Sequence, residues 1–137
     1  MKNPFNFYER LLPINNERKN AFEKLKGFSI DDSLVSLNTL RSLKIGEWHY
    51  TRDKKTKFKL IELTNKEAIF ITIMEAGASF SLHEHDCTEK GIVVEGHLID
   101  DLNHLKVKKD ENWIYVKGVK HKPYCLVRSV YEVTFME

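Results

Sequence analysis

Cysteine, long apolar runs and targeting signals are all scarce in this sequence. Only Cys87 and Cys125 occur among 137 residues, too few for the disulfide framework of a small secreted domain. No stretch approaches the roughly 20 apolar residues that a membrane-spanning helix requires. The first eight residues lack the apolar run and small-residue cleavage site of a secretory signal. We therefore expect a protein of the reducing cytoplasm with no membrane partner.

An excess of charge of one sign is also missing. The chain has 22 Lys and Arg against 20 Asp and Glu, a formal net charge of +2. Proteins that bind nucleic acid usually carry a clear basic excess. Two short lysine-rich runs, 52–57 and 106–109, are typical of solvated turns and strand edges. We therefore expect no nucleic-acid partner.

Short runs of β-branched and aromatic residues are abundant from about Ile45 onward. Hydrophobic residues make up 42% of the chain, enough for the core of one domain of this length. Gly, Asn and Asp separate runs at regular spacing, which is typical of an all-β sandwich or barrel of roughly eight strands. The predicted strands are 46–50, 58–63, 68–74, 91–94, 105–107, 113–116 and 131–135.

The first third of the chain has a different pattern. Asn15 or Asn16 can cap a helix over 17–26, and Gly27 is placed to end it. A second segment opens at 31–33 and repeats leucine every third residue up to Leu43, which favours a short helix over a strand. We expect residues 1–42 to form an arm and helical extension that packs on a β-domain at 43–137.

Three histidines and one glutamate are the strongest candidates for a functional site. Alternate side chains of a strand share a face, so His83 and His85 are expected to point the same way. A turn can return Glu89 beside them, and His121 can add a third nitrogen from a distant segment. Two imidazoles and a carboxylate, with a third imidazole from His121, are suitable ligands for a divalent metal. The alternative is that a His-x-His pair decorates a strand surface.

The spacing of these residues resembles the cupin superfamily. Gly77-x5-His83-x-His85-x3-Glu89-x6-Gly96 matches its first motif at every defined position. A chance match to so many defined positions is rare. The second motif is partial, since Gly118 and His121 are kept at the correct separation. Asp110, Val116 and Cys125 replace its other glycine, its proline and its asparagine.

The resemblance covers roughly residues 43 to 137 and carries several implications. It implies a cupin-type double-stranded β-helix, a jelly-roll barrel, with the metal held inside by the four residues. Glycines at 77, 96 and 118 would allow tight turns at strand ends. The metal could be Zn, Fe, Mn, Ni, Co or Cu. The resemblance makes a homodimer the expected assembly, and the spacing is loosely similar to metal-binding anti-sigma-factor cupin domains.

Several other residues are candidates for the pocket. Cys125 could be a thiol near the metal, although a buried cysteine is more often an apolar filler. His97 shares strand parity with Glu89 and could contact a ligand, and Tyr115 could place a hydroxyl at the pocket. Cys87 is expected in a turn near the mouth of the pocket. We expect His49 and His104 at the surface or in turns.

Two functions remain open on this pattern. In the first, the protein is an enzyme, a dioxygenase or an isomerase, in which the metal acts on a small-molecule substrate and Glu89 also moves a proton. In the second, it is a non-catalytic sensor or regulatory module that binds a metal or a small ligand. One barrel supports many chemistries, so the fold does not choose between them.

Overall fold

A computed structural model of the chain describes residues 34–137. The predicted arm and the helix over 17–26 lie outside the described residues, as does the start of the second helical segment at 31–33. The boundary between the extension and the β-domain at residue 43 stays a prediction. The expectation of an all-β fold is confirmed.

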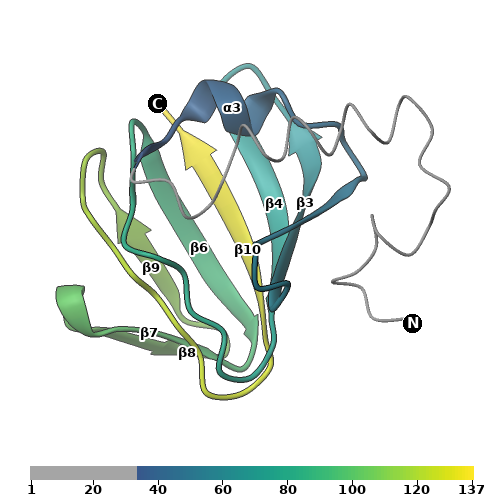
Figure 1. Ribbon diagram of the computed structural model, residues 1–137. Helices are drawn as coiled ribbons and strands as arrows, with labels where there is room; N and C mark the ends of the chain where they lie inside the picture. The colour runs from purple at the N-terminus through teal and green to yellow at the C-terminus, as the bar shows by residue number, and fades with distance from the viewer. Residues whose placement is uncertain (1–33) are drawn as a thin grey trace, which may run out of the picture.

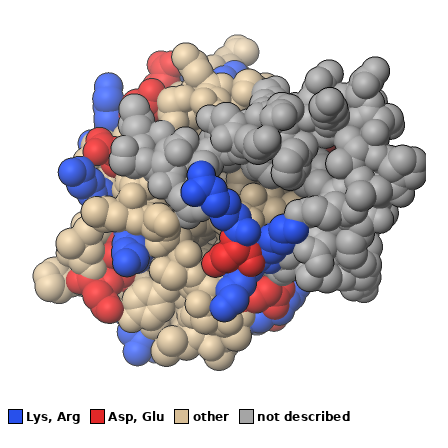
Figure 2. Space-filling view, in the orientation of Figure 1, with Lys and Arg blue, Asp and Glu red and all other residues tan. Residues whose placement is uncertain are grey.

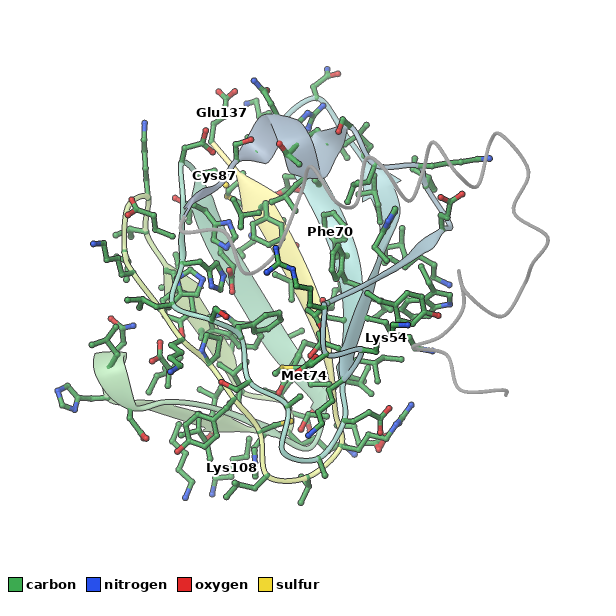
Figure 3. The ribbon with its side chains drawn as sticks, viewed as in Figure 1. Lys54, Phe70, Met74, Cys87, Lys108 and Glu137 are labelled. Atoms are coloured by element: carbon green, nitrogen blue, oxygen red, sulfur yellow. The ribbon has the colours of Figure 1, made fainter. Side chains whose placement is uncertain are left out.

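Six antiparallel strands form the main sheet, in the order β2-β3-β4-β10-β6-β9 (Figure 1). Every second residue of β4 is buried, so one face of this strand packs on the core. Phe70 and Met74 lie on that face and project into the interior (Figure 3). The strands are β2 (Trp48–Tyr50), β3 (Thr56–Leu63), β4 (Glu67–Met74), β6 (Thr88–Glu95), β9 (Asn112–Tyr115) and β10 (Ser129–Met136).

The opposite layer is built from shorter pieces. β1 (Leu34–Val35) pairs in parallel with β5 (Glu84–His85), and β7 (His97–Asp100) pairs with β8 (Leu105–Lys108). Isolated bridges join Ser79 to Tyr124 and His83 to His121. These bridges hold the segment before β5 against the segment before β10, and Figure 1 shows β7 and β8 together at one end of the long sheet.

One short helix, α3 (Leu37–Arg41), covers the other end of the sheet (Figure 1). The side chain of Ser36 accepts a hydrogen bond from the Thr39 N–H and so caps the helix. The leucine pattern correctly predicts a helix, but Leu34 lies in β1 instead, because it pairs with Glu84 of β5. Leu37, Leu40 and Leu43 are buried in the core.

Charged residues are mixed over the surface. On the face drawn in Figure 2, basic and acidic side chains alternate and gather into no single patch. Within residues 34–137 no helix is long and apolar enough to cross a membrane. His104 lies in an exposed turn as predicted. The prediction for His49 is wrong: its ring is buried and stacks on Phe58, because β2 pairs with β3 and turns this residue inward.

Candidate metal centre

His83 and His121 lie directly opposite each other on neighbouring backbone segments. The His83 N–H donates to the His121 carbonyl at 3.0 Å, and the His121 N–H donates to the His83 carbonyl at 2.8 Å. His85 follows two residues after His83, in β5. The Gly118 N–H donates to the His85 carbonyl at 3.0 Å, and Gly118 has a φ of +84° that glycine adopts without strain. The turn before His121 is thereby fixed to the strand that carries His85.

The three imidazole rings meet in the buried interior. One ring nitrogen from each of His83, His85 and His121 can be chosen so that all three lie within 4.8 Å of one another. All three side chains are buried. The structure therefore brings together residues that are up to 38 positions apart in sequence (121 − 83). The alternative of a His-x-His pair on the surface of a strand is wrong, because both histidines are buried.

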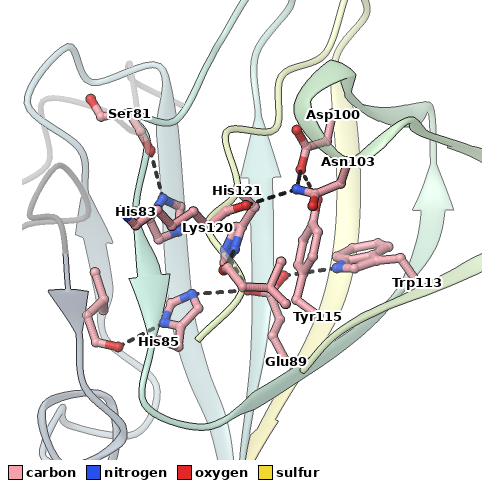
Figure 4. Close-up of polar contacts among 12 residues, drawn as sticks. Ser81, His83, His85, Glu89, Asp100, Asn103, Trp113, Tyr115, Lys120 and His121 are labelled. Atoms are coloured by element: carbon pink, nitrogen blue, oxygen red, sulfur yellow. Dashed lines mark hydrogen bonds and ion pairs between the residues drawn. The ribbon is translucent and has the colours of Figure 1, made fainter. Parts of the chain in front are cut away.

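Backbone carbonyls determine which nitrogen of each ring faces inward. The Nδ1 atoms of His83 and His85 lie 2.7 Å from the Ser81 carbonyl and 2.8 Å from the Val35 carbonyl. The Nδ1 atom of His121 lies 2.9 Å from a carbonyl oxygen of its own turn, that of Val119. A carbonyl only accepts, so each Nδ1 carries a hydrogen, and Nε2 of each ring has a lone pair when the ring is neutral. Figure 4 shows this arrangement. Proteins orient metal-binding histidines in the same way.

Glu89 brings a carboxylate to the same point from β6. Its Oε1 atom lies 3.1 Å from His85 Nε2 and 3.4 Å from His121 Nε2. Apart from this contact, neither Nε2 has a hydrogen-bond partner within residues 34–137. The Nε2 lone pairs of neutral imidazoles and a carboxylate are all acceptors, so a cation between them, either a proton on His121 or a metal ion, is needed to make the cluster favourable. A divalent metal fits this donor set.

The protonation states of the cluster follow from burial and mutual contact. Burial, together with the neighbouring His121 and His85, lowers the pKa of His83 to about 4. Burial alone raises the pKa of Glu89, but the hydrogen bonds and charges of His121 and His85 outweigh it and leave the pKa well below the usual value. Burial lowers the pKa of His121, whereas Glu89 raises it by more. At neutral pH His83 is therefore a neutral donor and Glu89 an anion.

Tyr115 supports the cluster from β9. Its ring stacks on His121, and its hydroxyl donates a 2.6 Å hydrogen bond to Asp100 Oδ2. Asp100 is fully buried and also accepts from Asn103 Nδ2 and the Leu102 N–H. Burial and the Asp100 carboxylate raise the pKa of Tyr115, so its hydroxyl stays protonated. Tyr115 contacts a candidate ligand, but it does not line the cavity beside it.

Three other candidate residues do not line the cavity beside the centre. The Cys125 thiol is buried in the apolar core and donates to the Glu75 carbonyl at 3.2 Å. His97 Nε2 accepts from the Leu126 N–H at 2.9 Å. Neither lines the cavity, because these contacts fix both side chains elsewhere. Cys87 is also buried, and burial raises the pKa of its thiol to about 12.

A small cavity of about 50 Å³ adjoins the candidate ligands. Most of its lining is hydrocarbon, and the few polar groups include Thr72 and the four candidate ligands. The apolar members that define its body are Leu40, Phe58, Phe70, Phe80, Leu98 and Phe135. A ligand that enters this space would meet polar atoms chiefly at the metal site.

Trp113 and the carbonyl groups of Ser81, Val35 and Val119 belong to the site but were missed in the sequence. The carbonyl contacts leave no signal there, because any residue supplies a carbonyl. Trp113 carries a weak signal, since it shares strand parity with Tyr115 and a buried indole N–H needs an acceptor. That acceptor is Glu89 Oε2, at 2.9 Å.

Comparison with known proteins shows the fold and leaves the activity open. No family model matches the sequence, and no curated protein matches it. Solved structures do match. KdgF from Halomonas sp. is 14% identical with a TM-score of 0.57, over 66% of this chain and 86% of that chain. An RmlC-like cupin from Shewanella frigidimarina is 18% identical with a TM-score of 0.58, over 69% and 89%.

An acetylacetone dioxygenase from Acinetobacter johnsonii is also similar. It is 17% identical with a TM-score of 0.57, over 69% of this chain and 72% of that chain. The chain therefore has the cupin fold, as the spacing of its first motif predicts. At such low identity the likeness extends to the fold alone.

Proposed function

We propose that the protein binds one divalent metal through Nε2 of His83, His85 and His121 and Oε1 of Glu89. The observation that carries this proposal is the convergence of these four acceptor atoms in a buried space. Each ring is already oriented by a carbonyl at Nδ1. The donor set is compatible with Zn, Fe, Mn, Ni, Co or Cu and does not select among them.

We propose further that the bound metal acts on a small molecule, in a dioxygenase or an isomerase. A metal held here would supply Lewis-acid activation. The chain's own part is to exclude water with the aromatic lining and to hold the four donors. A carboxylate with a lowered pKa is a weak general base, so the geometry favours Glu89 as a ligand over its expected role in moving a proton.

The cavity lining supports a small ligand with an apolar body. The described residues that line it include no Lys or Arg, so a carboxylate on the ligand would have only the metal as its partner. Burying an unpaired charge is costly. One structural neighbour is named an acetylacetone dioxygenase. Diketones are therefore the first substrates to test, with matched carboxylated compounds as the negative set.

The alternative is a sensor or regulatory module, and the size of the cavity favours it. An engineered cavity of about 150 Å³ holds benzene, whereas this cavity measures about 50 Å³. Without side-chain movement it accepts only a few heavy atoms. A metal that binds without catalysing a reaction would then change the stability of the barrel, and a partner protein would bind one of the two states in preference. The homodimer and the cytoplasmic location stay predictions.

Metal analysis of the purified protein tests the site itself. We expect about one divalent ion per chain in the wild type and its loss in His83→Ala. His104→Asn is the matched control, because it removes an exposed histidine at a left-handed position that asparagine tolerates. Equal metal content in all three proteins would refute the site. Oxygen uptake with the diketone panel then separates the enzyme from the module.

A further inference from the structure

Trp113 binds the side of Glu89 that faces away from the histidines. The two residues lie on adjacent strands, where Gly91 of β6 is opposite Trp113 and Glu89 is opposite Tyr115. Trp113 therefore reaches Glu89 along the diagonal of the sheet. Its Nε1–H donates to Glu89 Oε2 at 2.9 Å (Figure 4), and both side chains are buried. Oε1 alone is turned toward His85 and His121.

The indole has little freedom to leave this position. A Cβ atom on Gly91 would lie 2.3 Å from Cζ2 of Trp113, so the ring occupies the space where a side chain of β6 would stand. On another side the ring meets Tyr131 edge-to-face, with centroids 5.5 Å apart and planes at 89°. Close packing holds the indole of Trp113 in place. Its N–H in turn holds Oε2 of Glu89 through the hydrogen bond.

We propose that Trp113 is a positioning residue that limits Glu89 to one metal-binding oxygen. This inference rests on the proposed metal site. Three histidines and one oxygen supply four protein donors, whereas a carboxylate that uses both oxygens would supply five. An ion that accepts more than four ligands therefore keeps a further position for a small molecule. The indole hydrogen bond favours an open reactive site over a site closed by protein.

Cobalt(II) is a suitable probe because its visible absorption reports its coordination. Wild type and Trp113→Phe would be loaded with Co²⁺ and titrated with azide, which occupies open positions. Trp113→Phe keeps an aromatic ring and removes the N–H, which frees Oε2. We expect Co²⁺ to remain bound, the absorption to change, and azide to bind about tenfold more weakly or worse.

Trp48→Phe is the matched control, since Trp48 is the other tryptophan and lies in β2. It should leave the absorption and the azide affinity at wild-type values. A folded Trp113→Phe with wild-type absorption and azide affinity would overturn the positioning role alone, as would loss of Co²⁺ from that variant. A wild type that binds no Co²⁺ would overturn the metal site as well.

Infrared spectroscopy of the wild type gives a second test that needs no folded Trp113 variant. The difference between Co²⁺-bound and metal-free protein contains the stretches of the Glu89 carboxylate, and Glu89→Gln identifies them by their loss. A carboxylate that binds through one oxygen shows widely separated asymmetric and symmetric stretches, which is the expected result. Closely spaced stretches would show that both oxygens bind and would contradict the proposal.

Discussion

The phenol ring of Tyr115 lies parallel to the imidazole of His121, with centroids 4.1 Å apart and 8° between the planes. Asp100, fully buried, holds the hydroxyl of the same tyrosine. One side chain therefore links a buried carboxylate on β7 to a candidate ligand. The ring and the hydroxyl have separable roles, and each role can be removed by itself.

Tyr115→Phe should lower stability with little effect on the metal. The variant keeps the ring against His121 but leaves Asp100 without one donor, which costs about 1–3 kcal/mol of unfolding free energy. Tyr115→Leu removes the ring too and should weaken metal binding by about 10- to 100-fold. Urea unfolding and chelator competition measure the two effects. Equal metal affinity in both variants would show that the stacked ring has no part in orienting His121.

Metal affinity should fall as the pH falls through the pKa of His121. Glu89 raises this pKa above its usual value of 6.5, so in the metal-free protein His121 is protonated below that point and the ion must displace a proton. His83, with a pKa of about 4, adds a second proton only near that pH. Titration calorimetry in two buffers should show that ion binding releases more protons at pH 5.5 than at pH 8.5. Full occupancy retained at pH 4.5 would contradict this linkage.

A bound metal should stabilise the fold. Ions that bind only the native state add about 2.7 kcal/mol when their free concentration is 100 times Kd. Thermal unfolding should therefore shift upward with added Zn²⁺ or Co²⁺ and return with a chelator. His85→Ala should lose this shift, whereas the control His104→Asn should keep it. The same shift in His85→Ala would place the stabilising ion elsewhere.

Gly91→Ala should destabilise the protein through Trp113. The new Cβ would overlap the indole ring, and overpacking of this kind costs about 1–3 kcal/mol. Lys90→Ala, at the exposed neighbouring position, should stay within about 0.5 kcal/mol of the wild type. Denaturant midpoints at a fixed protein concentration compare them. If Gly91→Ala is as stable as Lys90→Ala, the indole does not lie against this glycine.

Both cysteines should resist modification in the folded protein. Cys87 and Cys125 are buried, and burial raises the pKa of each thiol. Because the thiolate is the reactive form, a thiol reagent should label the native chain slowly and the denatured chain at once. Rapid labelling of either thiol under native conditions would contradict its burial.

The sequence predicts most clearly the strands with long periodic patterns. The alternation through Phe70 and Met74 is visible in the sequence and matches β4. β1 and β5 have two residues each, too short to show any period. Their pairing depends on contacts between segments about 50 residues apart, which no local pattern encodes. The buried state of His49 was missed for the same reason, because its environment is a neighbouring strand.

The candidate ligands were predictable because a fixed spacing, His83-x-His85-x3-Glu89, combines a strand face with a turn. His121 was predicted from the resemblance to the second cupin motif, in which Gly118 and His121 keep their separation. The Trp113 contact with Glu89 Oε2 was not predictable, because it requires the register between β6 and β9. The sequence spacing thus identifies the candidate ligands. The orientation of the Glu89 carboxylate depends on how the strands pack, which the spacing does not show.

The most direct test of the metal site is a crystal structure of the Co²⁺-loaded protein with anomalous scattering measured at the cobalt edge. We predict one strong peak per chain, within bonding distance of Nε2 of His83, His85 and His121 and of a single oxygen of Glu89. A clean map with no peak between these groups, at full Co²⁺ saturation and neutral pH, would contradict the proposal.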